Sequence, residues 1–165
     1  MGDYAHVQEI RGLGSELARQ YLWEALVTPQ GGGPASPEQM QLRAMSTMLP
    51  DNASEETLIN YKSTKIQFAG RDASTKSLDL TFFDTEDLLV YKTFYNWVTY
   101  TKEAPKSAYE SDLTLRLLSR ADAVILEMVM FGAYPENLQQ VTLDYSAGDP
   151  LNIPVTMRYD YIVVR

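Results

Sequence analysis

The stretch "SLDLTFFDTEDLLVYKTFYNWVTYTK" (residues 77–102) contains both kinds of regular structure that the fold needs. Residues 77–84 alternate apolar and polar side chains, which is typical of a strand that buries one face. Beyond them the alternation stops, and capping signals predict an α-helix that runs to about Lys102. We therefore expect a strand that is followed immediately by a helix.

Signals for both ends of this helix are present in the sequence. Asp84 or Thr85 can cap its N-terminus. Glu86 and Asp87 would then lie in the first turn, where the helix dipole favours negative charge. Pro105 prevents the helix from continuing, because proline lacks the backbone N–H that another turn requires. Capping explains this acidic group more simply than a calcium site does.

Apolar side chains cover most of the circumference of the expected helix. Only Lys92, Asn96 and Thr99 form a polar stripe, and this stripe is narrow. A helix that rests on one sheet needs only one apolar face. Two interpretations stay open: the helix is buried within its own domain, or one face packs on a sheet while another meets a second subunit.

Alternation of apolar and polar residues predicts that most of the remaining chain is extended. Further strands are expected at 21–27, 39–48, 57–70 (one long strand or two short ones), 113–118, 121–131, 141–146 and 151–164. Polar, Gly-rich or Pro-rich segments predict loops at 28–38, 49–56, 71–76 and 102–112, and residues 1–19 are expected to form an N-terminal arm. Pro154 favours an edge position or a bulge in the last strand.

This order of elements predicts the fold class. Successive strands joined by short polar turns pair antiparallel. We expect a mainly β fold in which two packed antiparallel sheets form a sandwich or an open barrel with one flanking α-helix. The Gly-x-x-Pro sequence at 132–135 is expected to form a corner between two strands. No internal repeat is visible, so residues 1–165 are expected to form a single domain.

The composition limits what the protein can do. The chain has 14 Lys and Arg against 22 Asp and Glu, a net charge of −8, so it is not expected to grip a nucleic-acid backbone. It has no cysteine, which excludes disulfides and thiolate chemistry. The N-terminus lacks the apolar segment of a signal peptide, and no apolar run approaches the roughly 20 residues of a membrane helix. We therefore expect synthesis in the cytoplasm and no membrane contact.

Patterns typical of catalysis or metal binding are missing from the sequence. His6 is the only histidine, so a Ser-His-Asp triad would depend on a residue of the arm. One histidine and no cysteine exclude the usual spacings of a zinc site. The glycines at 11–16 and 31–33 lack the strand, helix and Lys-Ser/Thr context of a phosphate-binding loop. We expect no enzymatic activity, no cofactor and no metal.

Taken in order along the chain, several motifs resemble the tail tube protein family of contractile-tailed bacteriophages. They are "RAMSTMLP" (43–50), "INYKSTKIQFAG" (59–70), "LDLTFFD" (78–84), the Phe-x-x-Trp of the helix (Phe94 and Trp97), "GAYP" (132–135), "VTLDYS" (141–146) and a terminal Tyr-Asp-Tyr (159–161). The resemblance covers roughly residues 40–163. The N-terminal arm and the loop at 28–38 depart from the family pattern.

The resemblance implies an assembly. Members of the family have two packed β-sheets with a helix on the flank, form homo-hexameric rings and stack into a hollow tube inside a contractile sheath. The implied partners are the tail sheath, tape-measure, baseplate and tail-terminator proteins, and the implied location is the virion, after assembly in the host bacterial cytoplasm. The lumen would pass genome DNA without binding it, which suits a net charge of −8.

Three groups of candidate contact residues follow from the resemblance together with the strand pattern. Contacts between stacked rings are expected at Asp51, Asn52, Glu55 and Glu56, in a segment that is too long and acidic for a simple turn. Contacts of the helix with the sheath or a neighbour are expected at Tyr91, Lys92, Tyr95 and Asn96. Asp79, Asp144 and Asp160 are candidates for the lumen wall, and alternation alone does not tell which of them faces it.

Other functions stay open at this point. The chain could be the tube-initiator subunit at the baseplate. It could also be the tube protein of a type VI secretion system or another contractile injection machine, because these systems share the fold. A small-ligand-binding β-barrel is an alternative from a different class, since a barrel of eight strands can hold one ligand.

Overall fold

The computed structural model describes residues 18–165. The expected arm at 1–19 lies outside the described residues except for its last two positions, and His6 lies outside them as well. The elements of the described part, in order, are β1 (Trp23–Val27), α2 (Pro37–Arg43), β2 (Ala44–Thr47), β3 (Ser54–Tyr61), β4 (Thr64–Asp72), β5 (Ser77–Phe83), α3 (Leu89–Glu103), α4 (Lys106–Tyr109), β6 (Ser111–Leu118), β7 (Val124–Leu138), β8 (Asn152–Arg158) and β9 (Tyr161–Val164).

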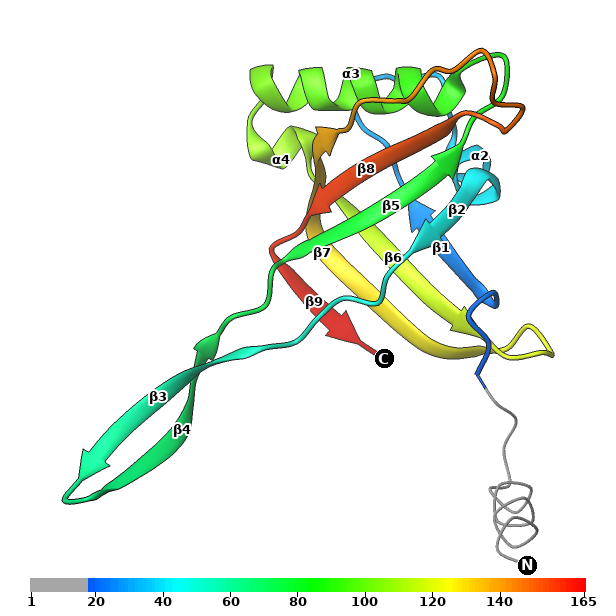
Figure 1. Cartoon of the computed structure of the whole chain (residues 1–165). Coiled ribbons are helices and arrows are strands. Elements are labelled where there is room, and N and C mark those ends of the chain that lie inside the picture. Colours follow the sequence, from blue (N-terminus) through cyan, green and yellow to red (C-terminus); the bar gives the residue numbers. More distant parts are fainter. Residues whose placement is uncertain (1–17) are drawn as a thin grey trace, which may run out of the picture.

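Seven strands form one antiparallel array that folds over into two layers. The array runs in the order β1-β6-β7-β8-β5-β2, and β9 also pairs with β7. The first part of β7 pairs with β6 and β9, and its last part pairs with β8, so β7 belongs to both layers. Figure 1 shows β2, β5 and β8 in front of β1, β6 and β7, with α3 across one end. The expected class, mainly β with two packed antiparallel sheets and a flanking helix, is confirmed.

The expected corner at 132–135 lies within β7, where the strand passes from one layer to the other. Gly132 has a φ of +69°, a backbone conformation that side chains other than glycine rarely adopt. A Cβ at this position would also collide with the carboxylate of Asp160. The register of β7 against β8 shifts just beyond, between Pro135 and Asn137. A glycine and a bulge therefore bend the strand without ending it.

The space between the layers is filled by the apolar faces of the strands and is closed at one end by α3. The largest fully buried side chains are Trp97, Phe82, Phe94, Met40, Leu80, Leu113, Leu115, Met130, Ile153, Met157, Val27 and Val90. Phe82 of β5 contacts Phe94 of α3, with ring centroids 5.2 Å apart. Burial of these side chains removes a continuous apolar surface from water, which is the main stabilising term of such a domain.

The carboxylate of Asp84 holds the N-terminus of α3 from a distance. It accepts hydrogen bonds from the backbone N–H groups of Val90 (3.3 Å) and Tyr91 (3.0 Å). The N-cap residue itself has a left-handed backbone and no capping side chain. The Asp84 carboxylate therefore accepts hydrogen bonds from the start of the helix as a cap does, although the N-cap residue is Leu88 and not Asp84 or Thr85. Glu86 and Asp87, however, precede the helix and do not form its first turn.

The strand expected at 39–48 is wrong over its first half, because residues 37–43 form α2. Ser36 and Gln39 make a capping box: the Ser36 hydroxyl accepts from the Gln39 N–H, and the Gln39 side chain accepts from the Ser36 N–H. Pro37 lies at the start of the helix, where its missing N–H costs nothing. Local capping therefore outweighs an alternation of apolar residues over a few positions.

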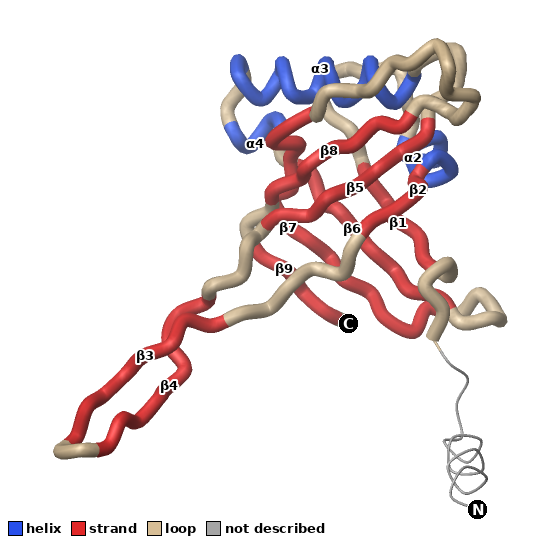
Figure 2. The backbone as a smooth tube through the Cα atoms, in the orientation of Figure 1, coloured by secondary structure: helices blue, strands red, loops and turns tan. Residues whose placement is uncertain are grey.

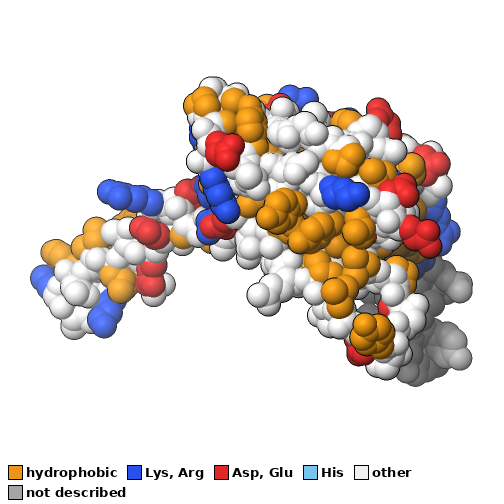
Figure 3. All heavy atoms as spheres, turned by 90° about the horizontal axis from the view of Figure 1, so that it is seen from above, with side chains coloured by type: hydrophobic (Ala, Val, Ile, Leu, Met, Phe, Trp, Pro, Cys, Tyr) orange, Lys and Arg blue, Asp and Glu red, His pale blue; other side chains and the backbone are white. Residues whose placement is uncertain are grey.

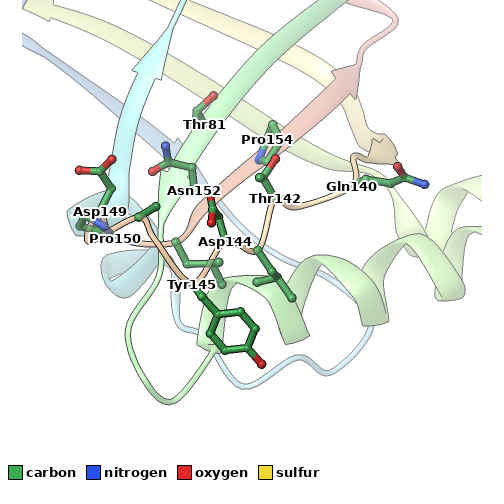
Figure 4. Close-up of a pocket in the computed structure, with 12 residues that line it drawn as sticks. Thr81, Gln140, Thr142, Asp144, Tyr145, Asp149, Pro150, Asn152 and Pro154 are labelled. Atoms are coloured by element: carbon green, nitrogen blue, oxygen red, sulfur yellow. The ribbon is translucent and has the colours of Figure 1, made fainter.

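The strand expected at 141–146 is also wrong. The link between β7 and β8 has no strand within it, and the Asp144 carboxylate accepts hydrogen bonds from the N–H and hydroxyl of Ser146, as in an Asx turn. Leu143 and Tyr145, which would share the apolar face of such a strand, are 82% and 111% exposed. Figure 4 shows Tyr145 directed away from the strands. An Asp two residues before a Ser gave the backbone a turn in place of a ladder.

The long terminal strand is two strands, because the chain bends at Tyr159 and Asp160 between β8 and β9. Pro154 is not at an edge, since β8 lies between β5 and β7. The pairing of β7 with β8 ends at Val155, so the position where Pro154 would have to donate a hydrogen bond lies beyond the ladder. The sheet thus accepts a proline where one neighbour has already ended.

Three expected loops are shorter than predicted. The loop at 28–38 ends where α2 begins, and the loop at 49–56 ends where β3 begins. The loop at 102–112 contains α4 and the start of β6. Of the two forms considered for 57–70, the pair of short strands is confirmed, with Tyr61 and Thr64 paired across a two-residue turn.

Candidate functional site

The β3–β4 hairpin projects from the two-layered body and pairs with no other strand of the described chain. Its two strands pair only with each other, in a sheet of their own. Every residue from Ser54 to Asp72 is exposed. Figure 2 shows the hairpin standing clear of the body, and Figure 3 shows apolar side chains along it and Lys or Arg side chains towards its end. It is therefore the most prominent candidate contact element.

The hairpin has one apolar face and one polar face. Cross-strand pairs Thr57–Phe68, Ile59–Ile66 and Tyr61–Thr64 share one face, and Leu58–Gln67 and Asn60–Lys65 share the other. Ile59, Tyr61, Ile66 and Phe68 are between 44% and 64% exposed. Such a face is typical of a strand pair that packs against something. Within residues 18–165, nothing covers it.

A polar network fixes the root of the hairpin. The Asp51 carboxylate accepts hydrogen bonds from the hydroxyl (2.8 Å) and N–H (3.3 Å) of Thr75, and the Ala73 N–H donates to the Ala53 carbonyl (2.7 Å). Beside it, the Lys76 ammonium lies 2.7 Å from the Asp72 carboxylate. This ammonium, with two hydrogen bonds from Ser74, holds the pKa of Asp72 well below its ordinary value. The hairpin therefore leaves the body in a defined direction.

The residues proposed for contacts between rings all lie at the root end of the hairpin. Asp51 belongs to the polar network, and Asn52 precedes β3 in an exposed link. Glu55 and Glu56 lie near the start of β3, at the end of the strand that is far from the tip at Lys62. The structure thus groups these four residues, although it gives the apolar face to other positions. Their contact role stays a prediction.

The helix candidates line one shallow hollow on α3. Tyr91, Lys92, Tyr95 and Asn96 form its wall together with Pro34. The rings of Tyr91 and Tyr95 stack at 6.1 Å. The opposite side of α3 buries Val90, Thr93, Phe94 and Trp97 at the spacing of one helix face. The helix therefore packs on the body by one face, and a second contact through its exposed face stays a prediction.

Asp79 lies on an outward face that is polar and internally hydrogen-bonded. Its carboxylate accepts from the Thr156 hydroxyl (2.9 Å), which in turn accepts from the Gln139 amide (3.2 Å). On the same face, Arg158 is paired with Glu136 at 2.7 Å. The face belongs to the layer of β2, β5, β8 and the end of β7. The polar groups of this face are therefore hydrogen-bonded or ion-paired to one another while they stay at the surface.

Of the other two lumen candidates, Asp144 borders this face and Asp160 lies away from it. Asp144 lines a hollow with Thr81 of β5 and with Asn152 and Pro154 of β8, as Figure 4 shows. Asp144 lies in the link between β7 and β8, where the hydrogen bonds from Ser146 lower the pKa of its carboxyl group. Asp160 lies at the bend before β9 and forms an ion pair with Lys106 of α4, which raises the pKa of that lysine. The structure therefore sets Asp160 apart and leaves Asp79 and Asp144 near the same outward face.

A surface that the sequence did not reveal runs between β1 and β2, which end the strand order β1-β6-β7-β8-β5-β2. Its lining comes from residues before β1, from β2 and its continuation, and from the end of β6: Gln20, Tyr21, Trp23, Ala44, Met45, Ser46, Thr47, Met48, Leu49, Leu115 and Leu117. We call it the seam groove. Tyr21, Met45, Met48 and Leu49 are all more than half exposed. The groove could not be predicted from a single strand over 39–48. The capping box at Ser36 is the sequence signal that would have predicted a helix there instead.

Metal-binding clusters and membrane-spanning helices are two further features that the described residues were expected to lack. Among residues 18–165, no group of three or more His, Cys, Asp or Glu side chains is arranged to hold a metal ion. Over the same residues, each helix is too short or too polar to cross a membrane. The candidate contact surfaces of the described chain are the hairpin, the helix hollow, the polar face and the seam groove.

A known relative matches most of the chain and is named for a structural role. No protein-family model matches the chain. The chain is 29% identical over 158 residues to a tail tube protein of Serratia phage KSP90, in a match that covers 88% of each. The resemblance inferred from the ordered motifs is thus confirmed. The relative is named for a structural component of a phage tail, which agrees with the expectation that this chain is not an enzyme.

Solved structures show where the fold occurs. A sheath/tube terminator of an extracellular contractile injection system in its extended state superposes with a TM-score of 0.72 at 14% identity, covering 92% of this chain and 99% of that one. A chain of the sheath-tube complex of such a system superposes with a TM-score of 0.66 at 13% identity, covering 92% and 93%. At these identities the likeness concerns the fold.

Proposed function

We propose that this protein is the structural subunit of a contractile phage tail tube, in which homo-hexameric rings stack into a hollow conduit. The observation that carries the proposal is the β3–β4 hairpin, an amphipathic projection whose apolar face has no partner within residues 18–165. A subunit that is complete only in contact with its neighbours is what an assembling tube requires. The tail tube relative, matched over 88% of its length, supports the same function.

The polar face around Asp79 is the best candidate for the lumen wall. It holds an aspartate, two hydroxyl side chains and an arginine that is already paired with Glu136. Unpaired cations on a wall would bind DNA phosphates and repeat that contact in every ring, whereas paired ones leave DNA free to slide. We therefore propose Asp79 as the first lumen candidate, with Asp144 at the border of the same face and Asp160 as the least favoured of the three.

The hollow on α3 is proposed to meet the tail sheath or a neighbouring tube subunit. It presents two stacked tyrosines beside Lys92 and Asn96, a mixture of apolar area and hydrogen-bonding groups that is common at protein interfaces. The sheath-tube complex of a contractile injection system has the same fold among its chains. The tape-measure, baseplate and tail-terminator proteins complete the proposed set of partners, in a tail assembled in the host cytoplasm.

Negative-stain microscopy of the purified protein tests the proposal directly. Six-fold rings or hollow rods are expected, and static light scattering should show mass that grows with concentration. A protein that stays monomeric at high concentration, and forms no rods after prolonged incubation or on addition of baseplate, contradicts the proposal. A bound small molecule in that monomer would instead favour the ligand-binding barrel.

A second measurement tests the conduit. Anisotropy of labelled duplex DNA is expected to show no binding to assembled rods at physiological salt. Binding at low salt that weakens steeply as salt rises would reveal a basic surface, because such a slope measures released counterions. In that case the assignment of the polar face to the lumen is wrong, even if rods form.

A tube-end subunit is the second candidate. It is favoured by the fold match to a sheath/tube terminator, which covers 99% of that chain. An end subunit, whether initiator or terminator, would form single rings that bind one end of preformed tubes. The main tube subunit would extend those tubes, so the length of seeded tubes separates the two functions.

A further inference from the structure

The seam groove is an opening into the hydrophobic core. β1 and β2 are the two ends of the strand array, so no strand pairs with their outer edges within residues 18–165. The groove between them reaches Leu115, a core residue that is 2% exposed, and Trp23 and Ala44, which pack against the core. Its rim carries Tyr21, Met45 and Met48. An apolar opening of this kind marks a binding surface.

We propose that the seam groove receives the apolar face of the β3–β4 hairpin from a second copy of this chain. This inference rests on the proposed tube function and names the partner surface of the hairpin. The two surfaces have matching chemistry: Ile59, Tyr61, Ile66 and Phe68 on the hairpin, and tyrosine, methionine and leucine side chains on the groove. Methionine adapts its shape easily, which suits a groove that must accommodate an inserted hairpin.

The hairpin requires a cover, and the groove requires an occupant. A two-stranded hairpin that packs on nothing is marginally stable in water, so its working state must bury its apolar face. The groove likewise leaves Met48 and Leu49 more than half exposed at the edge of the core. One contact between two copies removes both exposed surfaces from water.

The same copy is a poor source for this contact. The polar network at Asp51, Ala53 and Thr75 ties both strands of the hairpin at its root. Figure 1 shows the hairpin pointing away from the body, while β1 lies on the opposite side. The contact is therefore between copies, with the hairpin of each subunit serving the next. Such a head-to-tail contact continues from copy to copy.

Charge also favours a second copy of this chain. Residues 57–69, the outer part of the hairpin, contain Lys62 and Lys65 and no Asp or Glu. The chain has 14 basic and 22 acidic residues, so the remainder carries a net charge of −10. A tip of +2 is attracted to a body of this sign, which speeds encounter and disfavours tip-to-tip contact.

Two complementary variants test the contact. Ile59→Asp places a charge on the apolar face of the hairpin and leaves the groove intact, whereas Met48→Asp damages the groove and leaves the hairpin intact. Leu58→Asp is the matched control for the hairpin, because Leu58 is as exposed as Ile59 (53% against 50%) and lies on the opposite face. Leu143→Asp, at an exposed position outside the groove, is the control for Met48.

Each defective variant alone is expected to stop at its smallest species, a monomer or a single ring, while both controls form rods. An equimolar mixture of the two defective variants should form one productive contact, so light scattering should show a doubling of that mass and no further growth. Rods from Met48→Asp alone would overturn the inference while leaving the proposed tube function intact. The absence of rods from the unchanged protein would instead count against the function.

Cysteine pairing provides a readout that does not depend on assembly. The natural chain has no cysteine, so Tyr61→Cys mixed with Met45→Cys can form a disulfide only between copies. A crosslinked dimer is expected under oxidation, and Asn60→Cys, on the polar face, should crosslink at least tenfold less. Equal crosslinking of the two hairpin positions contradicts the inference. So does a groove occupied by residues 1–17 of its own copy, which would appear as crosslinking that increases on their deletion.

Discussion

β5 and the β3–β4 hairpin have the same sequence pattern and opposite surroundings. Leu80 and Phe82 of β5 are at most 1% exposed, whereas Ile66 and Phe68 of the hairpin are 44% and 51% exposed. Both segments alternate apolar and polar residues, and both form regular antiparallel ladders. Alternation therefore states that one face of a strand must be covered, but it does not state by which chain. In this protein the body covers β5, whereas nothing within residues 18–165 covers the apolar face of the hairpin.

The sharpest test of this comparison removes the same side chain from both regions. Phe82→Ala should lower the free energy of unfolding of the monomer by about 3–5 kcal/mol, because it leaves a cavity beside Phe94 in the core. Phe68→Ala should change it by less than about 0.5 kcal/mol, since that ring is already in water. Urea denaturation under conditions that prevent assembly measures both. A large loss from Phe68→Ala would show that the hairpin packs on its own body.

A smaller effect is expected where the body depends on one polar group. Asp84→Ala removes the acceptor for two backbone N–H groups at the start of α3 and should cost about 1–2 kcal/mol. Asp87→Ala is the control, and it should change the free energy of unfolding by less than about 0.5 kcal/mol, because Asp87 precedes the helix. Equal effects of the two substitutions would mean that general negative charge, and not the Asp84 hydrogen bonds, stabilises the helix.

A weaker, pH-dependent effect is expected at the root of the hairpin. Lys76 and Ser74 lower the pKa of Asp72 in the folded protein, so the ionised carboxylate stabilises the fold. This stabilisation is present above the pKa of Asp72 in the unfolded chain and is lost as pH falls through its pKa in the folded protein. Lys76→Met should raise the pKa of Asp72 towards its ordinary value, because it removes the largest cause of the shift. NMR titration of the carboxyl carbon measures this. An unchanged pKa would assign the shift to Ser74.

The smallest effect is predicted for the largest alteration. Replacing residues 54–72 by Asn-Gly joins Ala53 to Ala73, which are already linked by a backbone hydrogen bond, through a turn suited to a hairpin. The free energy of unfolding of the monomer should stay within about 0.5 kcal/mol, because the hairpin contributes nothing to the core. Assembly should be lost. A destabilised monomer would break the distinction between hairpin and body.

Much of the fold could be predicted from the sequence, wherever local signals and tertiary packing agree. β1, β5 and β6 follow from alternation, and α3 follows from Asp84 and Pro105. The errors occur where short polar residues offered the backbone another partner. Ser36 with Gln39 turned an apparent strand into α2, and Asp144 with Ser146 turned another into a loop.

The candidate surfaces were less predictable, because they depend on which strands become edges. The position of the hairpin could be predicted from the pattern at 57–70. The predicted contact residues, however, lie at the root of the hairpin and not on its apolar face. The polar face around Asp79 required the pairing of β5 with β8. The seam groove could be recognised only from the whole strand order. Tyr21 and Met45 are distant in sequence, and tertiary structure brings both to the lining of the groove.

The 15-residue strand β7 gives the body a mechanical property. Because one continuous backbone is hydrogen-bonded into both layers, sliding one layer over the other would stretch covalent bonds or shear two ladders at once. Gly132 bends this strand without interrupting it. The subunit should therefore be stiff under a compressive force along its long strands, and its loops should deform first. A column of such subunits resists buckling by the construction of each block as well as by the joints between them.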